Sequence, residues 1–415
     1  MQKILNYQIL EQIYASERTT IYRAYVESSK KLVILKLPNH LYPNLKQLAQ
    51  YRSAYTLIKD LNFPGIVKML ALEKFEQRLI LVMEDFGGIS LYQYLSNQDT
   101  SSLNIIPLEI SDFFHIALQI VNPLKKLHNH QIIHKDIKPQ NIIINPHTKR
   151  IQIIDFSSIT KLPKEKVEVR NPNTWEGTLA YISPEQTGRM NRGIDFRSDL
   201  YSLGVTFYQL LTGQLPFTSE DPMELVHCHI AKIPQPIIDI NFNIPKPLND
   251  IVLKLMAKMP EERYQSLKGL GHDLKKCQYE WKNNRQIGLF DLGTKDRSKS
   301  LMISEKIYGR DRELEKLLTA FDRVSDQEKP QSELMLLGGF SGIGKSVLVN
   351  EIHKPIVEKR GYFIAGKFDQ FQRNIPFLAW LNAFAELIKQ ILSEPEAKLQ
   401  AIAIKLQQVL GEEAQ

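Results

Sequence analysis

Apolar residues follow two different spacings over residues 7–281, which predicts alternating strands and helices. Short β-branched or apolar runs predict strands at residues 33–36, 79–83, 142–144 and 151–154. Between residues 111 and 128 the apolar side chains recur at helical spacing, with Ser111 as the expected N-cap. Pro123 lies inside this helical pattern and predicts a kink. The last two strands, separated by a polar turn at residues 145–149, predict a hairpin.

The pattern changes after residue 281. Residues 282–305 are polar and charged with few apolar side chains, which predicts a linker. A new α/β pattern begins near residue 306, with a buried strand expected at residues 333–337 and a helix opening at residues 347–352. The sequence therefore predicts a first domain at residues 7–281, a linker at residues 282–305, and the N-terminal portion of a second domain at residues 306–415.

Charge and cysteine content exclude several classes of protein. Lys and Arg number 53 and Asp and Glu 46, a net charge of +7, and no dense basic block indicates a nucleic-acid partner. Two cysteines, Cys228 and Cys277, give no disulfide framework and fit a reducing compartment. The N-terminus lacks the apolar core of a signal peptide, and no run approaches the roughly 20 apolar residues that span a bilayer. We expect a cytoplasmic protein without membrane insertion.

A polar segment just before the predicted hairpin carries the strongest candidate chemistry. It reads His134-Lys135-Asp136-Ile137-Lys138-Pro139-Gln140-Asn141, and Asp155-Phe156 follow the hairpin. Phosphoryl transfer from ATP needs positioning and charge neutralisation more than covalent chemistry. Asp136 is the candidate to accept or orient the proton of an incoming hydroxyl, and Lys138 to balance charge on the transferred group. Asn141 and Asp155 are candidate ligands of Mg²⁺, a cation that prefers oxygen donors.

This segment has the form H-x-D-x-K-x-x-N and resembles the catalytic loop of eukaryotic-like Ser/Thr protein kinases. The resemblance implies that Lys36 grips the α- and β-phosphates of ATP. It also implies a hinge at residues 84–86, where the backbone of Glu84 and Phe86 binds adenine, with Met83 as the gatekeeper residue. The implied activity is ATP- and Mg²⁺-dependent phosphorylation of serine and threonine in protein substrates, in signal transduction.

Further parts of the kinase pattern follow in order. The stretch ending in Ser183-Pro184-Glu185 resembles the end of an activation segment, and Arg263 is the expected partner of Glu185. Thr178 stands where the family contacts the catalytic lysine and aspartate, which indicates serine and threonine substrates. Whether hydroxyls of the activation segment are phosphorylated or unmodified stays open; the candidates are Ser157, Ser158, Thr160, Thr174 and Thr178.

Several positions depart from the family pattern. Tyr14, Ser16 and Thr19 stand where the phosphate-covering loop has glycines, and side chains there hinder a close backbone approach. Ala54 stands where a helix glutamate pairs with the phosphate lysine, and residues 38–59 contain no acid. Ser157 follows Asp155-Phe156 in place of glycine, and Lys135 replaces arginine. The alternative is therefore a nucleotide-binding pseudokinase that regulates an attached ATPase or histidine kinase.

The second domain carries its own phosphate-binding motif. Residues 339–346 fit G-x-x-x-x-G-K-[ST], the P-loop. Gly339, Gly342 and Gly344 would let backbone amides cradle the phosphates, with Lys345 reaching the terminal phosphates and Ser346 on Mg²⁺. A P-loop NTPase also needs a second acidic site, for which Asp369 is a poor candidate. Hydrolysis by this module is therefore doubtful, and nucleotide binding is expected.

Stretches at residues 176–192, 227–232 and 361–370 resemble large cyanobacterial-type multi-domain signalling kinases. In that family a Ser/Thr kinase precedes an AAA-type ATPase, sensor domains and often a histidine kinase. The expected fold is thus an α+β bilobal protein-kinase-like domain followed by an incomplete α/β P-loop NTPase domain. We expect the chain to be the N-terminal part of a longer protein, or a truncated gene product. A metal site at residues 227–229 is disfavoured, because adjacent ligands cannot easily share one tetrahedral ion.

Overall fold

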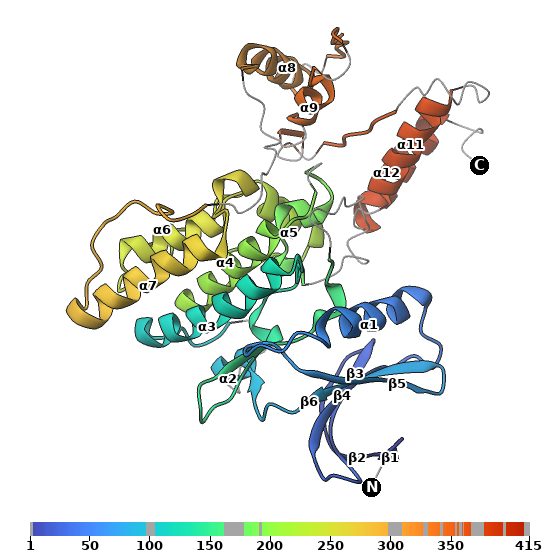
Figure 1. Ribbon diagram of the computed structural model, residues 1–415. Coiled ribbons are helices and arrows are strands. Elements are labelled where there is room, and N and C mark those ends of the chain that lie inside the picture. The colour runs from blue at the N-terminus through green and yellow to red at the C-terminus, as the bar shows by residue number, and fades with distance from the viewer. Residues whose placement is uncertain are drawn as a thin grey trace.

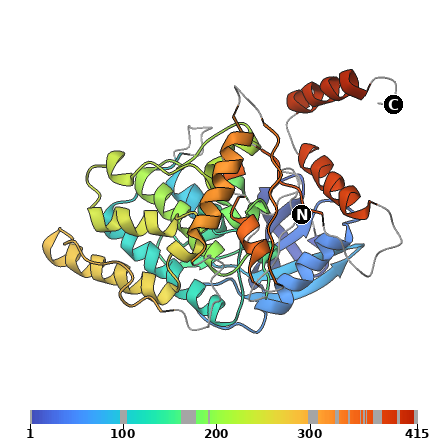
Figure 2. The same ribbon diagram turned by 90° about the horizontal axis from the view of Figure 1, so that it is seen from above.

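A computed structural model of the chain describes residues 3–96, 104–161, 178–190, 193–297, 309–326, 331–340, 343–352, 355–356, 359, 361–366, 377–392 and 396–410. Figure 1 shows a small lobe of strands with helix α1 and a large lobe of helices, and the view from above in Figure 2 shows them side by side. This arrangement confirms the two-lobed α+β fold expected for the first domain.

The small lobe is built on one antiparallel sheet of six strands in the order β1-β2-β3-β4-β6-β5. Its elements are β1 (Lys3–Ile4), β2 (Tyr7–Ala15), β3 (Thr19–Val26), β4 (Leu32–Pro38), α1 (Leu45–Ile58), β5 (Met69–Phe75) and β6 (Arg78–Glu84). The predicted strands at residues 33–36 and 79–83 are thus β4 and β6, which pair with each other.

The large lobe contains most of the hydrophobic core. Its helices are α2 (Leu91–Leu95), α3 (Ile110–Asn129), α4 (Arg197–Thr212), α5 (Pro222–Ile230), α6 (Lys246–Leu255) and α7 (Leu267–Asn284). Its small sheet joins β7 (Ile89–Ser90), β8 (Ile142–Ile144) and β9 (Ile151–Ile153). Its 3-10 turns are η1 (Pro139–Asn141), η2 (Phe156–Ser158), η4 (Leu179–Tyr181), η5 (Pro184–Thr187), η6 (Ile237–Asp239) and η7 (Pro260–Glu262). The predicted hairpin is the antiparallel pair β8–β9.

Helix α1 begins at a capping box and packs against β5, β6 and η2. The Asn44 side chain accepts a hydrogen bond from the Gln47 amide at 2.8 Å, and Gln47 Oε1 accepts one from the Asn44 amide at 3.3 Å. These bonds satisfy donors that a helix start leaves unpaired. Its buried residues are Tyr51, Ala54 and Ile58. Their spacing of three and four places them on one face, toward the lobe interior.

Helix α3 differs from its prediction at its first residue. It begins at Ile110 after Glu109, which makes no side-chain cap, so Ser111 is not the N-cap. The earlier start buries Ile110 in the core, and the Ser111 hydroxyl instead accepts a hydrogen bond from Arg285 Nη1 at 3.2 Å. The helix continues through Pro123, whose ring packs so closely on the small lobe that a Cβ at Gly65 would lie 2.7 Å from it.

Residues 285–297 form a strap along the large lobe, although they lie within the predicted linker at 282–305. Three of its side chains pack against the core: Ile287, Phe290 and Leu292. At its end, the Asp296 carboxylate accepts hydrogen bonds from the Gln265 amide at 2.6 Å and the Ser266 hydroxyl at 2.7 Å. Part of the predicted linker is therefore ordered structure, and the domain boundary itself stays a prediction.

The second domain contributes α8 (Asp311–Val324), α9 (Lys345–Asn350), α11 (Leu378–Ile391) and α12 (Glu396–Leu410). The buried strand predicted at residues 333–337 is wrong. These residues have no strand partner, and Leu334 and Leu336 are 86% and 89% exposed. A strand needs a neighbour for its backbone hydrogen bonds, and none of the described residues from 309 to 410 forms one.

Within the described segments, no helix is both long and apolar enough to cross a membrane. The same residues contain no group of three His, Cys, Asp or Glu side chains placed to hold a metal ion.

A pH prediction arises from His229, which lies fully buried at the end of α5. Its Nδ1 lies 3.0 Å from the Tyr201 hydroxyl, and burial, reinforced by Lys258, lowers the pKa of His229 to about 3. In the unfolded chain the imidazole titrates near its ordinary pKa of about 6.5. Between these values only the unfolded state binds the proton, so the free energy of unfolding falls as the pH falls, by up to about 1.4 kcal/mol per pH unit.

We expect His229→Gln to flatten the dependence of the unfolding free energy on pH between about 6.5 and 4. Urea unfolding at several pH values gives the unfolding free energy of the unmutated protein and of His229→Gln. The slope of this free energy against pH is then compared between the two proteins. His115→Gln, which changes an exposed histidine of α3, should keep the unmutated slope. Equal slopes for all three proteins would contradict the burial of a neutral His229.

Candidate active site

Strand β4 delivers Lys36 to the interior between the two lobes. Lys36 pairs with Ile21 of β3 on one side and with Leu81 of β6 on the other, so its backbone is fixed by a central strand. The residue is only 8% exposed. Its Nζ lies 2.6 Å from Oδ1 of Asp155, which follows strand β9. The fold therefore brings together two charged groups separated by more than a hundred residues of sequence.

This ion pair is held in its charged form. Burial alone would lower the pKa of the Lys36 ammonium, but the attraction of the Asp155 carboxylate outweighs it and raises that pKa. Burial would likewise raise the pKa of the Asp155 carboxyl, but Lys36, with a smaller contribution from the Ser157 side chain, holds it well below its usual range. Asp155 has a left-handed backbone, and its side chain accepts the Ser157 amide hydrogen bond at 3.3 Å. Both groups are thus ionised at neutral pH.

The predicted catalytic residues converge around Asp136. Lys138 Nζ donates to Asp136 Oδ2 at 2.7 Å and also to the Thr178 hydroxyl. Asn141 Nδ2 donates to the same carboxylate oxygen at 2.8 Å and to the Asp136 carbonyl at 2.9 Å. The Thr178 amide lies 3.3 Å from Asp136 Oδ1. Each of these donors comes from a residue named from the sequence.

Asp199, in the first turn of α4, fixes the backbone of the loop that carries Asp136. Its carboxylate accepts the amide hydrogen bonds of His134 at 2.9 Å and Lys135 at 2.7 Å, and lies 2.8 Å from His128 Nε2. Burial would raise the pKa of Asp199, but these partners, His128 foremost, lower it. Asp199 was not among the site residues named from the sequence. Its short spacing from the activation segment was the available signal.

The end of the activation segment is fixed by a buried ion pair, as predicted. Arg263 Nη1 and Nη2 donate to the two Glu185 oxygens at 2.8 and 2.9 Å, and the Ser198 hydroxyl donates to Glu185 at 2.6 Å. Burial would raise the pKa of Glu185, but Arg263 outweighs it and lowers that pKa. The predicted residues Thr174, Glu176 and Gly177 lie outside the described part of the chain.

Comparison with known proteins decides the family. Residues 7–274 match the protein kinase domain, and residues 306–415 match the AAA ATPase domain. The chain belongs to the protein kinase family. Within this chain the kinase domain is joined to an AAA ATPase domain.

Several curated kinases are similar to this chain. The hybrid signal transduction histidine kinase G of Dictyostelium discoideum is 33% identical over 73% of this chain and 11% of that relative. A probable serine/threonine-protein kinase of Clostridium perfringens is 28% identical over 65% of this chain and 38% of its own length. The serine/threonine-protein kinase PrkC of Bacillus subtilis is 29% identical, covering 65% and 40%. The chain thus spans well under half the length of these relatives.

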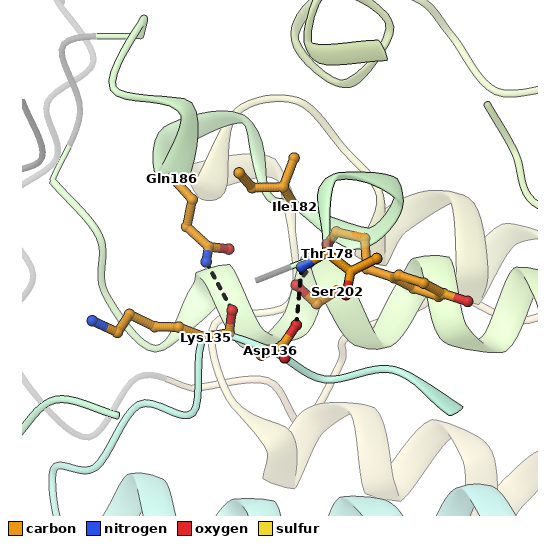
Figure 3. Close-up of a pocket in the computed structure, with 7 residues that line it drawn as sticks. Lys135, Asp136, Thr178, Ile182, Gln186 and Ser202 are labelled. Carbon is orange, nitrogen blue, oxygen red and sulfur yellow. Dashed lines mark hydrogen bonds between the residues drawn. The ribbon is translucent and has the colours of Figure 1, made fainter. Parts of the chain in front are cut away.

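A pocket lies beside Asp136, at the foot of the activation segment. Figure 3 shows Gln186 Nε2 donating to the Lys135 carbonyl, a bond of 2.9 Å, and the Thr178 amide facing Asp136. The Lys135 side chain extends away from Asp136. The lining residues are Lys135, Asp136, Thr178, Tyr181, Ile182, Gln186 and Ser202. The pocket therefore borders the Asp136 carboxylate.

The predicted adenine-binding hinge of the kinase follows β6. Met83 is buried and pairs with Ile34, which fits its predicted place at the back of the nucleotide site. The Glu84 amide donates to the Lys68 carbonyl at 3.0 Å, and Phe86 is half-buried. Adenine contacts of Glu84 and Phe86 stay a prediction.

The glycine-free hairpin between β2 and β3 is held by side chains. The Ser16 hydroxyl accepts the Thr19 amide hydrogen bond at 3.2 Å, closing the turn. Asn39, beyond the end of β4, donates to the Ser16 carbonyl and accepts from the Thr20 hydroxyl. Tyr14 is 55% exposed. This hairpin is thus tied to β4, whereas a glycine-rich loop would be free to adapt to phosphates.

The oxygen atoms at this site are suitable ligands for a magnesium ion. Because Asn141 Nδ2 donates to Asp136, its amide oxygen is the atom left for a cation, and the ionised Asp155 supplies carboxylate oxygen. Oxygen donors of this kind suit Mg²⁺.

The P-loop of the second domain is described apart from residues 341–342, so the predicted Gly342 lies outside the described residues. Gly344 has a left-handed backbone (φ 95°) just before α9, which begins with Lys345 and Ser346. Lys345 Nζ donates to the Gly339 carbonyl at 2.7 Å and the Phe340 carbonyl at 2.8 Å. The lysine thus folds back over its own loop.

Proposed function

We propose that the kinase domain transfers the γ-phosphoryl group of ATP to serine or threonine hydroxyls of protein substrates. The observation that carries this proposal is the joint placement of Lys36, Asp136, Lys138, Asn141 and Asp155, each ordered by hydrogen bonds. The curated serine/threonine kinases similar to this chain support the same activity.

Each group has a defined part in the proposed reaction. Asp136 accepts the proton of the substrate hydroxyl, while Lys138, bonded to Asp136 and Thr178, stays beside the carboxylate to balance charge on the transferred group. Lys36 holds the phosphates of ATP, and the backbone of Glu84 and Phe86 holds adenine. Magnesium, held by Asn141 and Asp155, neutralises phosphate charge.

A second candidate function is a nucleotide-binding pseudokinase that regulates the attached AAA module. The hairpin at Ser16 and the buried Ala54 favour it, because both weaken the usual grip on ATP. The P-loop residues Gly339, Gly342, Gly344, Lys345 and Ser346 would bind a second ATP with its Mg²⁺ in either case.

The wider setting is also a proposal. Cys228 and Cys277 are buried and are not joined in a disulfide, which suits a reducing cytoplasm. The similarity to a hybrid histidine kinase supports a place in signal transduction, with sensor or histidine kinase domains as partners.

Comparing substitutions at the two nucleotide sites tests the assignment. We expect Lys36→Met to slow phosphotransfer about 10²–10³-fold, because a buried cation aimed at the phosphates is lost. Lys345→Ala should instead remove a second bound nucleotide and leave phosphotransfer in place. Labelled ATP measures transfer, and equilibrium binding gives the number of nucleotides per chain. If Lys345→Ala lost phosphotransfer while Lys36→Met kept it, the proposal would be contradicted.

A further inference from the structure

Helix α1 leaves Lys36 without a carboxylate on the small-lobe side. No acidic residue lies between residues 38 and 59, and Ala54 is buried with 1% exposure. Among the described residues, the Lys36 ammonium makes one side-chain hydrogen bond, the 2.6 Å bond to Asp155 in the large lobe. An ammonium has three donors, so this single bond leaves most of its hydrogen-bonding capacity unused.

Tyr51 lies on the same buried face of α1, one turn before Ala54, and is 6% exposed. Its hydroxyl is buried and makes no hydrogen bond of good geometry to a described residue, although an interaction with the Thr19 side chain acts to lower its pKa. A buried polar group without a partner costs about 1–3 kcal/mol, and few are tolerated in folded proteins. Phenylalanine would fill the same space without this cost. The hydroxyl therefore calls for an explanation other than packing.

The surroundings of the hydroxyl point to the nucleotide site. The charges that act on it are the Lys36 ammonium and the Asp155 carboxylate. Helix α1 packs directly on η2, the turn that follows Asp155. Burial raises the pKa of Tyr51, so the hydroxyl is neutral at pH 7 and can accept a hydrogen bond from Lys36 without removing its charge.

We infer that Tyr51 is a positioning residue that holds Lys36 from helix α1, in the place where a helix carboxylate is absent. This inference rests on the proposed ATP site. Hydrogen bonds of active sites are often long before the substrate binds and tighten in its complex, so the Tyr51–Lys36 bond forms as nucleotide is bound. A neutral partner leaves the full positive charge of Lys36 directed at the phosphates.

Substitution of Tyr51 separates this role from packing, with every variant made in Lys345→Ala protein so that only the kinase site binds nucleotide. Tyr51→Phe should raise the dissociation constant for Mg-ATP about tenfold, as expected for a hydrogen bond to a charged group. Its melting temperature should stay equal or rise, because a buried unpaired hydroxyl is removed. Tyr55→Phe, four residues along α1, is the matched control and should alter neither quantity.

A rescue variant gives the sharpest outcome. Adding Ala54→Glu to Tyr51→Phe places a carboxylate one turn along the same face and should recover most of the lost ATP affinity. An unchanged dissociation constant in Tyr51→Phe would overturn the inference, as would a parallel fall in melting temperature and affinity. The inference about Tyr51 is tested by the dissociation constant for Mg-ATP, which does not depend on phosphotransfer. A protein that binds Mg-ATP but transfers no phosphate would therefore contradict the proposed kinase activity and still test the role of Tyr51.

Discussion

The Asp136→Asn variant should transfer phosphate about 10²–10⁴-fold more slowly than the unmutated protein, while still binding Mg-ATP. The Asp136 carboxylate accepts hydrogen bonds from Lys138 at 2.7 Å and Asn141 at 2.8 Å, so its position is fixed before substrate arrives. An amide of the same shape keeps that position but cannot take the proton of the substrate hydroxyl. The loss therefore falls on the transfer step and spares nucleotide binding.

Single-turnover transfer from labelled ATP measures this effect, and equilibrium binding of Mg-ATP provides the second readout. Asp60→Asn changes an exposed carboxylate after α1 and serves as the matched control, with transfer at the unmutated rate. Equal transfer rates for Asp136→Asn and the unmutated protein would show that Asp136 is not the base.

The largest expected effect on stability follows from loss of Arg263. This side chain has no exposed surface, and its guanidinium bonds both Glu185 oxygens and the carbonyls of Ala257, Arg197 and Lys258. Arg263→Met leaves the Glu185 charge buried without its partner. Removing one partner of a buried ion pair costs about 3–5 kcal/mol. For a domain of this size that lowers the melting temperature by about 6–20 °C.

Thermal unfolding followed by circular dichroism measures the loss. Lys3→Met breaks an exposed ion pair with Glu27, at 2.9 Å, and should cost less than about 1 kcal/mol. The double variant Arg263→Met with Glu185→Leu should recover part of the stability, because an apolar pair removes the buried charge. A single variant as stable as the Lys3→Met control would contradict the account.

Local motifs allowed the central residues to be named from the sequence. Asp136, Lys138 and Asn141 lie within one short loop, so their spacing in the sequence is enough to bring their side chains into contact. Thr178 and Arg263 were found because the order of kinase motifs predicts their partners Lys138 and Glu185. The β8–β9 hairpin followed from two β-branched runs around a polar turn.

Contacts set by tertiary packing could not be named in this way. The contacts of Asp199 depend on how α4 packs against the segment at His134 and Lys135. The role inferred for Tyr51 depends on which face of α1 is buried. Ile287, Phe290 and Leu292 lie in the predicted linker, where their irregular spacing gives no periodic signal of their packing. The strand predicted at residues 333–337 failed because apolar composition supplies no neighbouring strand to bond with.

The most direct test of the central claim is transfer of labelled phosphate from Mg-ATP by the unmutated chain to itself or to a basic protein substrate, followed by phosphoamino acid analysis. We expect phosphoserine or phosphothreonine, without phosphotyrosine, and dependence of the transfer on Lys36 and Asp136. Binding of Mg-ATP at Lys36 with no transfer to any hydroxyl would contradict this expectation and favour the pseudokinase.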